Sequence, residues 1–375
     1  MSSTTHDRYH RQLILQGFGS GAQDALTKAK VLVIGAGGLG CPVLQYLVAA
    51  GVGTIGIVEN DQVSLSNLHR QVLYDTTDVG RNKIEVAAEK LRLINPDVII
   101  VCYPIYLDKI NSLTIIAEYD VIVDCTDNFA TRYMVNDACV IIGRPLVYGA
   151  VSEFEGQVAV FNVGSEEGRR SANYRDLFPE QPKRGEVLNC AEAGVLGVLP
   201  GIIGSLQATE VIKLITGKGD VLINQLLTYN ALKNRMNVFN YSVNKNATLM
   251  LPTTAEAFQK MEYDDNCIVE TTEYGIDVFQ VEQLMKEKNA VIVDVREPHE
   301  LPLITLYHHH KIPLPQLQTR LPEIAGQTII FICQSGTRSL QAAQMAAAYF
   351  ANEHRFYSLN GGVTQLISLP ESKSL

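Results

Sequence analysis

The stretch "KVLVIGAGGLG", residues 30–40, decides the fold of the first part of this chain. A short apolar run leads into Gly35, Gly37 and Gly40, which have the spacing G-x-G-x-x-G. These glycines permit a tight turn, a close approach of the backbone to phosphate, and close packing of the next helix on the strand. The stretch therefore predicts a strand, a phosphate-binding loop and the start of a helix.

The region around this stretch alternates apolar runs with helix-like segments. Such an alternation predicts a Rossmann-like α/β domain with a mainly parallel sheet and helices on both faces. Glu59 ends the second apolar run, where an acid would bind a ribose hydroxyl. Taken alone, this pattern predicts NAD as readily as ATP. The strand-like runs are residues 30–37, 54–60, 97–106, 120–127 and 145–151.

The polar residues that follow the glycine loop favour ATP. "SNLHRQ" contains Asn67 and Arg70, "GRNK" contains Lys83, and "DCTDN" contains Asp127 and Asn128. A triphosphate under attack needs cations along its charge and a carboxylate that holds Mg²⁺. Arg70 and Lys83 supply cations, and Asp127, at the carboxyl end of a strand, is a candidate Mg²⁺ ligand. Each alone is more typical of a salt bridge or a helix cap, but together they favour a triphosphate site.

Composition excludes several classes of function. A chain of 375 residues is long for one domain and suits two, and its formal net charge of −9 argues against nucleic-acid binding. No apolar run reaches the roughly 18 residues that span a membrane. The start, "MSSTTHDRYHRQ", lacks the apolar stretch of a signal peptide. The seven cysteines are scattered singly, so we expect a cytoplasmic protein with reduced thiols.

Several motifs together resemble the MoeB/ThiF/HesA family, the bacterial relatives of ubiquitin-activating enzymes. The resemblance covers about residues 7–240 and rests on "RYHRQ", "GAGGLG", "SNLHRQVLY", "GRNK", "DCTDN" and "NCAEAGVLGVLPGIIGSLQATEVIKLITG". It implies adenylation, with ATP and Mg²⁺, of the C-terminal glycine of a ubiquitin-like sulfur carrier (MoaD/ThiS-like).

The resemblance also implies roles for individual residues. Arg11 matches an arginine that reaches the triphosphate from the partner subunit, which implies a homodimer. Cys190 matches the active-site cysteine of the adenylation domain, and Asp127 matches the Mg²⁺ ligand. The residues at ATP-binding positions are Gly38, Glu59, Ser66, Asn67, Leu68, His69, Arg70, Lys83, Asp127 and Asn128.

Two positions depart from the family pattern. The family usually has Asp where this chain has Glu59, and the extra methylene still permits contact with a ribose. Many members bind a structural zinc with two C-x-x-C pairs, but the first pair is replaced here by "NYRD", with Asn173 and Asp176. Asparagine and aspartate are poor substitutes for thiolates in such a site, so the sequence predicts no zinc.

The chain turns polar at residues 246–268, which we interpret as a linker between an adenylyltransferase domain (1–245) and a second domain (269–375). The apolar runs "AVIVDVRE" and "TIIFICQSG" and a helix from about Thr337 predict a small α/β domain there. Cys333 ends a strand before "QSGTRS", where backbone N–H groups and the helix dipole would favour a thiolate. We therefore expect an accessible, nucleophilic thiol rather than a buried structural one.

This second domain resembles a rhodanese, through "DVREPHE", "CQSGTRS" and "LNGGV". A tyrosine-phosphatase-type loop would need an arginine six residues after the cysteine, where this chain has Ser339. The loop instead suits a persulfide, with sulfur coming from a donor such as a cysteine desulfurase or thiosulfate. The usual "GHIPGA" segment is replaced by "YHHHKIPLP".

Together the domains predict an adenylyltransferase with a sulfurtransferase domain, which forms a carrier thiocarboxylate for molybdopterin synthesis. Cys190 would form an acyl intermediate or resolve an acyl disulfide. Three alternatives remain open at this point: the same chemistry for thiamin or another pathway, a binding module in which the second domain only recruits a sulfur donor, and a nicotinamide oxidoreductase.

Overall fold

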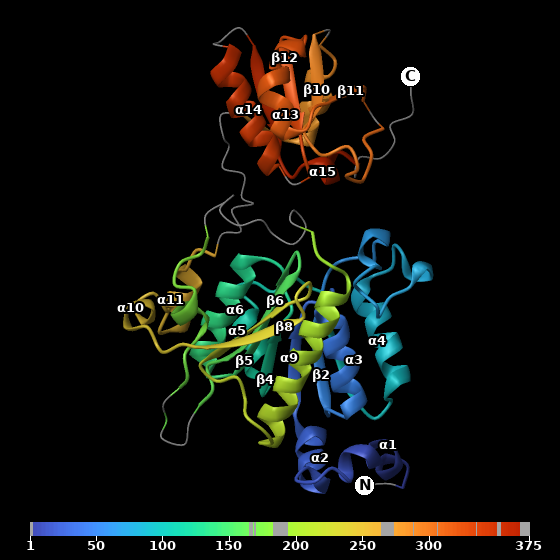
Figure 1. Cartoon of the computed structure of the whole chain (residues 1–375), viewed down its shortest axis with the longest axis vertical. Helices are drawn as coiled ribbons and strands as arrows, with labels where there is room; N and C mark the ends of the chain where they lie inside the picture. Colours follow the sequence, from blue (N-terminus) through green and yellow to red (C-terminus); the bar gives the residue numbers. More distant parts are fainter. Residues whose placement is uncertain are drawn as a thin grey trace. The chain divides into compact units, whose positions relative to one another are not determined.

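The computed structural model describes residues 3–164, 168, 170–182, 194–263, 274–287, 289–305, 307–334, 336–350 and 354–367. The chain divides into two compact units, Met1–Asp265 and Asn266–Leu375. Figure 1 shows both, and each is described here by itself.

The described part of the first unit contains an eight-stranded sheet in the order β3-β2-β1-β4-β5-β6-β7-β8. The first five strands in that order are parallel, and the remaining pairs, from β5–β6 to β7–β8, are antiparallel. The predicted mainly parallel α/β fold is confirmed. The strands are β1 (Lys30–Ile34), β2 (Thr54–Val58), β3 (Ile99–Tyr103), β4 (Val121–Asp124), β5 (Leu146–Ser152), β6 (Glu155–Phe161), β7 (Gln225–Asn230) and β8 (Arg235–Asn240).

Helices cover both faces of this sheet, because its central strands are apolar on both sides. Along β1, Val31 and Val33 belong to one hydrophobic cluster, and Leu32 and Ile34 belong to the other. The first cluster includes residues of α3, α4 and α9, and the second includes residues of α5 and α6 (Figure 1). The helices are α1 (Ser3–Leu13), α2 (Gly19–Lys28), α3 (Gly40–Ala50), α4 (Lys83–Ile94), α5 (Ser112–Ala117), α6 (Phe129–Ile142), α7 (Tyr174–Leu177), α9 (Val198–Thr216), α10 (Lys245–Thr248) and α11 (Ala255–Lys260), with 3₁₀ turns η1 (Leu65–Asn67) and η2 (Thr76–Asp78).

Helix α9 is long and apolar enough to cross a membrane, by length and composition alone. In this fold it packs against α3, β5 and β6. Its Glu210 is buried and accepts a hydrogen bond from the backbone N–H of Leu222 at 2.9 Å. The apolar character of α9 is therefore that of a core helix, whose side chains cover one face of the sheet.

The segment predicted as a linker is partly folded onto the first unit. Phe258, in α11, is buried in the cluster that contains α6. The side chain of Gln259 donates to the carbonyl of Lys109 at 2.6 Å, and the Lys109 ammonium donates to the carbonyl of Met261 at 2.7 Å. The chain thus stays attached to the first unit as far as Tyr263, whose hydroxyl donates to Asp137 at 2.8 Å.

The second unit has a parallel sheet of five described strands in the order β11-β10-β12-β13-β9. Its predicted α/β fold is confirmed. The elements are β9 (Gly275–Ile276), α12 (Val278–Leu284), β10 (Ala290–Asp294), β11 (His309–Lys311), α13 (Leu314–Arg320), η3 (Leu321–Glu323), β12 (Thr328–Ile332), α14 (Thr337–Phe350), β13 (Arg355–Leu359) and α15 (Val363–Ile367).

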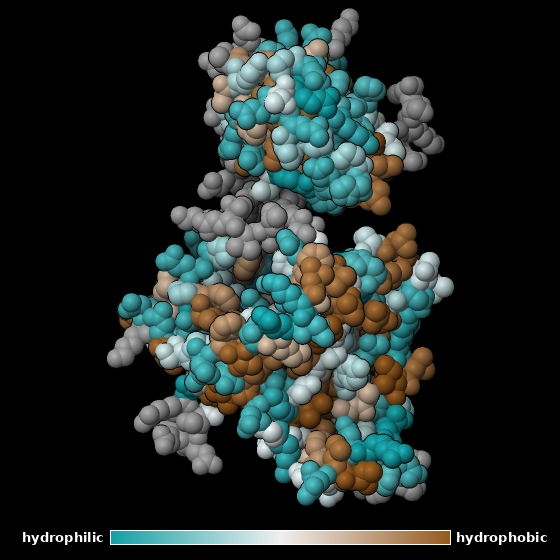
Figure 2. All heavy atoms as spheres, in the orientation of Figure 1, coloured by the Kyte–Doolittle hydropathy of each residue, from teal (hydrophilic) through white to brown (hydrophobic). Residues whose placement is uncertain are grey.

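The two units differ in their exposed surface. Figure 2 shows hydrophobic patches on the visible face of the first unit, whereas the visible face of the second is mostly hydrophilic. Strand β8 lies at the edge of the sheet and all its residues are exposed, including the apolar Met236, Val238 and Phe239. Exposed apolar surface of this kind is typical of protein-binding regions.

Candidate functional site

The glycine loop between β1 and α3 is held tightly against β4. Gly35 has a φ of +92°, which L side chains rarely adopt, and a Cβ there would lie 3.0 Å from the carbonyl oxygen of Cys125. A Cβ on Gly40 would lie 2.0 Å from the carbonyl oxygen of Gly35. Both positions need glycine, so that the loop can turn and α3 can begin directly beneath it.

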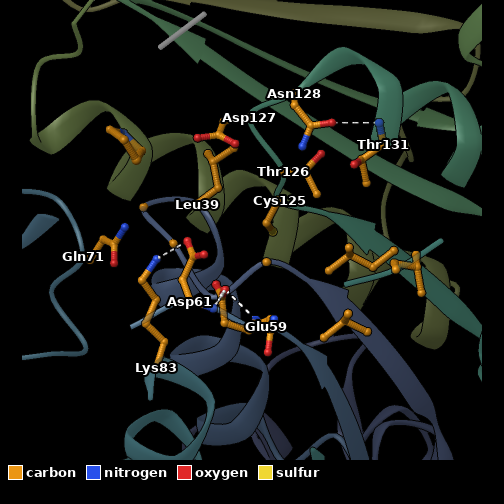
Figure 3. Close-up of a pocket in the computed structure, with 18 of the residues that line it drawn as sticks. Leu39, Glu59, Asp61, Gln71, Lys83, Cys125, Thr126, Asp127, Asn128 and Thr131 are labelled. Atoms are coloured by element: carbon orange, nitrogen blue, oxygen red, sulfur yellow. Dashed lines mark hydrogen bonds and ion pairs between the residues drawn. The ribbon is translucent and has the colours of Figure 1, made fainter. Parts of the chain in front are cut away.

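A cavity of about 360 Å³ lies beside this loop, at the carboxyl ends of β1, β2 and β4. Since β2 and β4 flank β1 on opposite sides, this is the point where the order of the strands reverses, and ligands bind there in open α/β sheets. Figure 3 shows the cavity. The predicted residues that line it are Gly38, Glu59, Arg70, Lys83, Asp127 and Asn128.

Glu59 holds the glycine loop as well as lining the cavity. Its Oε2 accepts from the backbone N–H of Ala36 at 2.9 Å. Its Oε1 accepts from the N–H groups of Asn60 and Asp61, each at 2.9 Å. A carboxylate can accept about four hydrogen bonds, so these three leave capacity for a ribose hydroxyl, the contact predicted from the sequence.

Lys83 is buried, and its ammonium lies 3.0 Å from Oδ2 of Asp61. Figure 3 shows the two side chains pointing toward one another. Lys83 is the first residue of α4, and Asp61 follows β2. The sequence interpretation did not include Asp61, because no motif connects it with Lys83.

Asp127 and Asn128 lie in the loop between β4 and α6. The Asn128 side chain accepts from the N–H of Thr131 at 2.8 Å and caps α6, so this predicted ligand-binding residue also has a structural role. Asp127 is exposed and lines the cavity. A carboxylate that is accessible to solvent suits a hard cation such as Mg²⁺.

Arg70 is the one residue of the predicted segment 66–70 that lines the cavity. Its Nη1 donates to the carbonyl of Ser66 at 3.2 Å and lies 2.8 Å from Nε2 of His69. Burial and the neighbouring Arg70 lower the pKa of His69. Ser66 and His69 thus contact the Arg70 side chain but do not line the cavity themselves. The other predicted residues, Asn67 and Leu68, do not line it either.

Two further predicted residues, Arg11 and Cys190, are not placed at this cavity either. Arg11 is exposed and lines a separate cavity beside α1, α3 and α9, together with Tyr46 and Thr209. Its action from a partner subunit stays a prediction. Cys190 falls outside the described residues, so its role also stays a prediction.

A second cavity, of about 480 Å³, adjoins the first. Asp127, Arg132 and Val151 line both cavities. The second is largely aromatic, with walls that include Tyr133, Tyr148, Phe129, Tyr174 and Phe178.

Arg132 was not predicted from the sequence. Its guanidinium donates to the carbonyl of Thr126 at 2.9 Å and lies over the rings of Phe129 and Tyr148. It is buried near Asp124, and burial raises the pKa of that carboxyl while Arg132 opposes the rise. A cation thus stands at the junction of the polar cavity and the aromatic one.

The residues at the expected zinc position do not fit a zinc site. The Asn173 side chain donates to Oδ2 of Asp176 at 2.6 Å, and Oδ1 of Asp176 accepts from the N–H of Asn244 at 2.7 Å. The described residues contain no group of three or more His, Cys, Asp or Glu side chains that could hold a metal. The oxygens of this "NYRD" segment are occupied by internal hydrogen bonds. The absence of zinc from the protein stays a prediction.

A buried ion pair lies next to this segment. Arg175 donates from Nε to Oδ1 of Asp137 at 2.8 Å and from Nη2 to Oδ2 at 2.7 Å. Asp137 also accepts from the Tyr263 hydroxyl. Burial lowers the pKa of Arg175, but the hydrogen bond and the charge of Asp137 outweigh this effect and raise the pKa. The pair joins α6 to α7 and to the chain segment that follows α11.

In the second unit, Cys333 lies directly after β12 and before α14, as predicted. The backbone N–H of Gly336 donates to its Sγ at 3.1 Å. The thiol is buried, however, and belongs to a hydrophobic cluster with Phe331 and Ala343. The expected accessibility is therefore wrong, because Cys333 is fully enclosed by its neighbours.

Two ion pairs stabilise the segments next to Cys333. Arg296 makes a buried two-point contact with Asp294, at 2.9 and 2.8 Å, and its Nη1 lies 3.3 Å from Oε1 of Gln334. Arg338 makes two hydrogen bonds of 2.6 Å with Glu300, and this contact lowers the pKa of Glu300 against the effect of its burial. The "DVREPHE" and "CQSGTRS" segments, distant in sequence, are thus joined.

Comparison with known proteins matches both units. The ThiF family model matches residues 9–249, and the rhodanese-like domain model matches residues 278–368. The "Probable adenylyltransferase/sulfurtransferase MoeZ" of Mycobacterium tuberculosis is 39% identical over 95% of this chain and 91% of the relative. The "Sulfur carrier protein adenylyltransferase" of Thermus thermophilus is 55% identical over 60% of this chain and 84% of the relative.

Solved structures match about two thirds of the chain. The crystal structure of E. coli MccB with MccA-N7isoASN has a TM-score of 0.57 and 25% sequence identity, and covers 64% of this chain and 73% of that chain. "Adenylyltransferase and sulfurtransferase MOCS3" of Xenopus laevis is 37% identical in sequence over 95% of this chain and 85% of its own length.

Proposed function

This chain belongs to the ThiF family and is an enzyme with a C-terminal rhodanese-like domain, and we propose that it adenylates a sulfur carrier and then transfers sulfur to it. The substrate of the first step is the C-terminal glycine carboxylate of a ubiquitin-like protein, activated with ATP and Mg²⁺. The observation that carries this proposal is the junction of the two cavities at Asp127 and Arg132.

The polar cavity fits the nucleotide. Its glycine loop offers backbone N–H groups and a helix N-terminus to phosphate. Arg70 and Lys83 supply the positive charge that a leaving pyrophosphate needs, and Asp127 would hold Mg²⁺. Oε1 of Gln71, a residue that also lines the cavity, is buried and has no hydrogen-bond partner among the described residues, so it can accept from a ligand.

The aromatic cavity fits the carrier's tail. An extended peptide that ends in a carboxylate can lie along its apolar wall and reach the polar cavity at Arg132. There the guanidinium would hold the carboxylate beside the α-phosphate. A carboxylate oxygen then attacks that phosphorus, pyrophosphate leaves, and the product is an acyl adenylate. The proximity of the two cavities makes this attack effectively intramolecular.

The second step uses Cys333 as a persulfide. Its outer sulfur attacks the acyl carbon, AMP leaves, and an acyl disulfide joins the carrier to Cys333. A second thiol then attacks the Cys333 sulfur and releases the carrier thiocarboxylate. Cys190 is the candidate for this thiol, unless it forms an acyl intermediate instead. A cellular thiol reductant then reduces the disulfide that remains and restores both thiols.

The carrier we propose serves molybdopterin synthesis, and a carrier for thiamin or another pathway is the alternative. The sulfur comes from a cysteine desulfurase or thiosulfate. We further propose a cytoplasmic homodimer, in which Arg11 reaches the partner's nucleotide.

The deciding experiment is ATP–pyrophosphate exchange, measured with purified carriers of each pathway. Exchange that depends on one carrier and on Mg²⁺ would support adenylation and identify the pathway. If no carrier supports exchange while NAD binds, the nicotinamide alternative would replace this proposal.

A further inference from the structure

Two buried serines lie beside Cys333. Ser339 is in the first turn of α14, and Ser358 is in β13. Their side chains are 0% and 1% exposed, in a region whose other packed side chains are largely apolar. A buried hydroxyl costs free energy unless it is hydrogen-bonded, so the partners of these two are informative.

The hydroxyls form a short chain that ends at the sulfur. Oγ of Ser339 lies 3.4 Å from Sγ of Cys333 and 2.8 Å from Oγ of Ser358. Both hydroxyls also reach the carbonyl oxygen of Gly336, at 3.1 Å from Ser339 and 3.4 Å from Ser358. The N–H of the same Gly336 donates to the sulfur at 3.1 Å.

This arrangement provides hydrogen-bond partners for the sulfur both as a thiol and as a thiolate. When Cys333 is a thiol, its S–H can donate to Ser339, Ser339 to Ser358, and Ser358 to the carbonyl of Gly336. When Cys333 is a thiolate, the Ser339 hydroxyl can rotate and donate to the sulfur, while Ser358 donates to Ser339 or to that carbonyl. No heavy atom has to move, since a hydroxyl hydrogen turns freely to suit its partners.

We propose that Ser339 is a catalytic residue of the sulfur-transfer step, which stabilises the Cys333 thiolate, and that Ser358 positions its hydroxyl. This proposal rests on the proposed role of Cys333. A serine occupies the position where a phosphatase loop would place an arginine, but its side chain contacts the sulfur of the nucleophile instead of the substrate.

The thiolate occurs twice in the reaction. With thiosulfate, it attacks the outer sulfur, the S–S bond of thiosulfate breaks, sulfite leaves, and the persulfide forms. It is formed again when the outer sulfur passes to an acceptor such as cyanide, which leaves as thiocyanate. A side-chain donor to this buried anion changes the rate, because a hydrogen bond to a charged group is stronger than one to a neutral group.

The test is thiosulfate:cyanide sulfurtransfer by the full-length protein, measured as a function of pH. We expect Ser339→Ala to lower the rate near neutral pH roughly ten- to hundredfold. The rate should recover at higher pH, so that the midpoint of the profile moves upward. Ser358→Ala should move the midpoint in the same direction by a smaller amount. Ser339→Thr keeps a hydroxyl and should therefore show the wild-type profile. Thr319→Ala is the control, because it removes an exposed hydroxyl of α13 that, among the described residues, bonds to the carbonyl of Gln316 alone.

Different results would contradict the role of the serines and the proposed function of Cys333. Activity in Cys333→Ala would refute the proposed function. An inactive Cys333→Ala, with wild-type profiles in both serine variants, would mean that the pair only joins β13 to α14. If Ser339→Ala does not fold, an unshifted profile in Ser358→Ala refutes the inference.

Discussion

The ammonium of Lys83 lies 3.0 Å from the carboxylate of Asp61, at the wall of the polar cavity. The Lys83 side chain is 5% exposed, and that of Asp61 is 57% exposed. A buried lysine tends to lose its charge unless an anion stabilises it. Asp61 is the anion paired with Lys83, and it holds the ammonium at the space assigned to the triphosphate.

The first prediction concerns this pair. Lys83→Ala should lower the rate of ATP–pyrophosphate exchange about a hundredfold, because a preorganised cation is lost. Asp61→Ala should lower it about tenfold, and Asp61→Asn less, because the amide oxygen still accepts a hydrogen bond. In the Lys83→Ala background, Asp61→Ala should have little further effect. Fully additive losses would show that Asp61 acts independently of Lys83.

The second prediction concerns Asp127. Asp127→Ala should abolish exchange and leave the thermal unfolding temperature unchanged, because this exposed carboxylate contributes no core packing. EDTA should abolish exchange by the wild-type protein, and added Mg²⁺ should restore it. Exchange that persists in the variant would mean that another residue holds the metal.

The third prediction concerns assembly. Mixing an Arg11→Ala protein with an Asp127→Ala protein should restore activity, because each hybrid dimer has one intact site. With random pairing, about a quarter of the wild-type sites should be regained. Light scattering that gives a monomer mass, or a mixture as inactive as its components, would rule out action across subunits.

The fourth prediction separates the two cysteines. Cys333→Ala should keep pyrophosphate exchange, which uses no thiol, but should lose the mass gain of one sulfur atom and thiocarboxylate formation. Cys190→Ala should keep exchange and show a defect only in transfer or release. If Cys333→Ala formed thiocarboxylate at the normal rate from a persulfide donor, the second domain would only recruit that donor.

The fifth prediction concerns the buried pair of Asp137 and Arg175. Asp137→Ala should destabilise the first unit by about 3–5 kcal/mol, because it leaves Arg175 buried without its partner. Tyr263→Phe removes one hydrogen bond to Asp137 and should cost about 1 kcal/mol. Both are measured by denaturant unfolding.

The control for this prediction is metal removal. EDTA should not change the unfolding midpoint of the wild-type protein, since hydrogen bonds and the ion pair occupy the polar groups of this region. A midpoint that falls with EDTA and recovers with Zn²⁺ would show that the protein binds a structural zinc after all.

Local patterns predicted much of the fold. β1, β2, β3 and β4 each lie within a predicted apolar run, β5 extends one residue beyond its predicted run, and α14 begins at Thr337 as expected. Apolar periodicity and the glycine loop are properties of neighbouring residues, so they can be read before the chain folds. The strands β6, β7 and β8 were not predicted. β7 and β8 are neighbours in the sequence, but β6 pairs with β7 across a long stretch of chain, which local patterns do not reveal.

The sequence by itself determined the two α/β units, the glycine loop, and the cations and carboxylate that line the polar cavity. Only the tertiary structure decided that Asp61 pairs with Lys83, that Arg132 joins two cavities, and that Cys333 is buried against Ser339. The physical reason is that motifs encode backbone geometry over a few residues. Ion pairs, burial and shared cavities arise from contacts between distant segments, which form only when the sheets and helices pack.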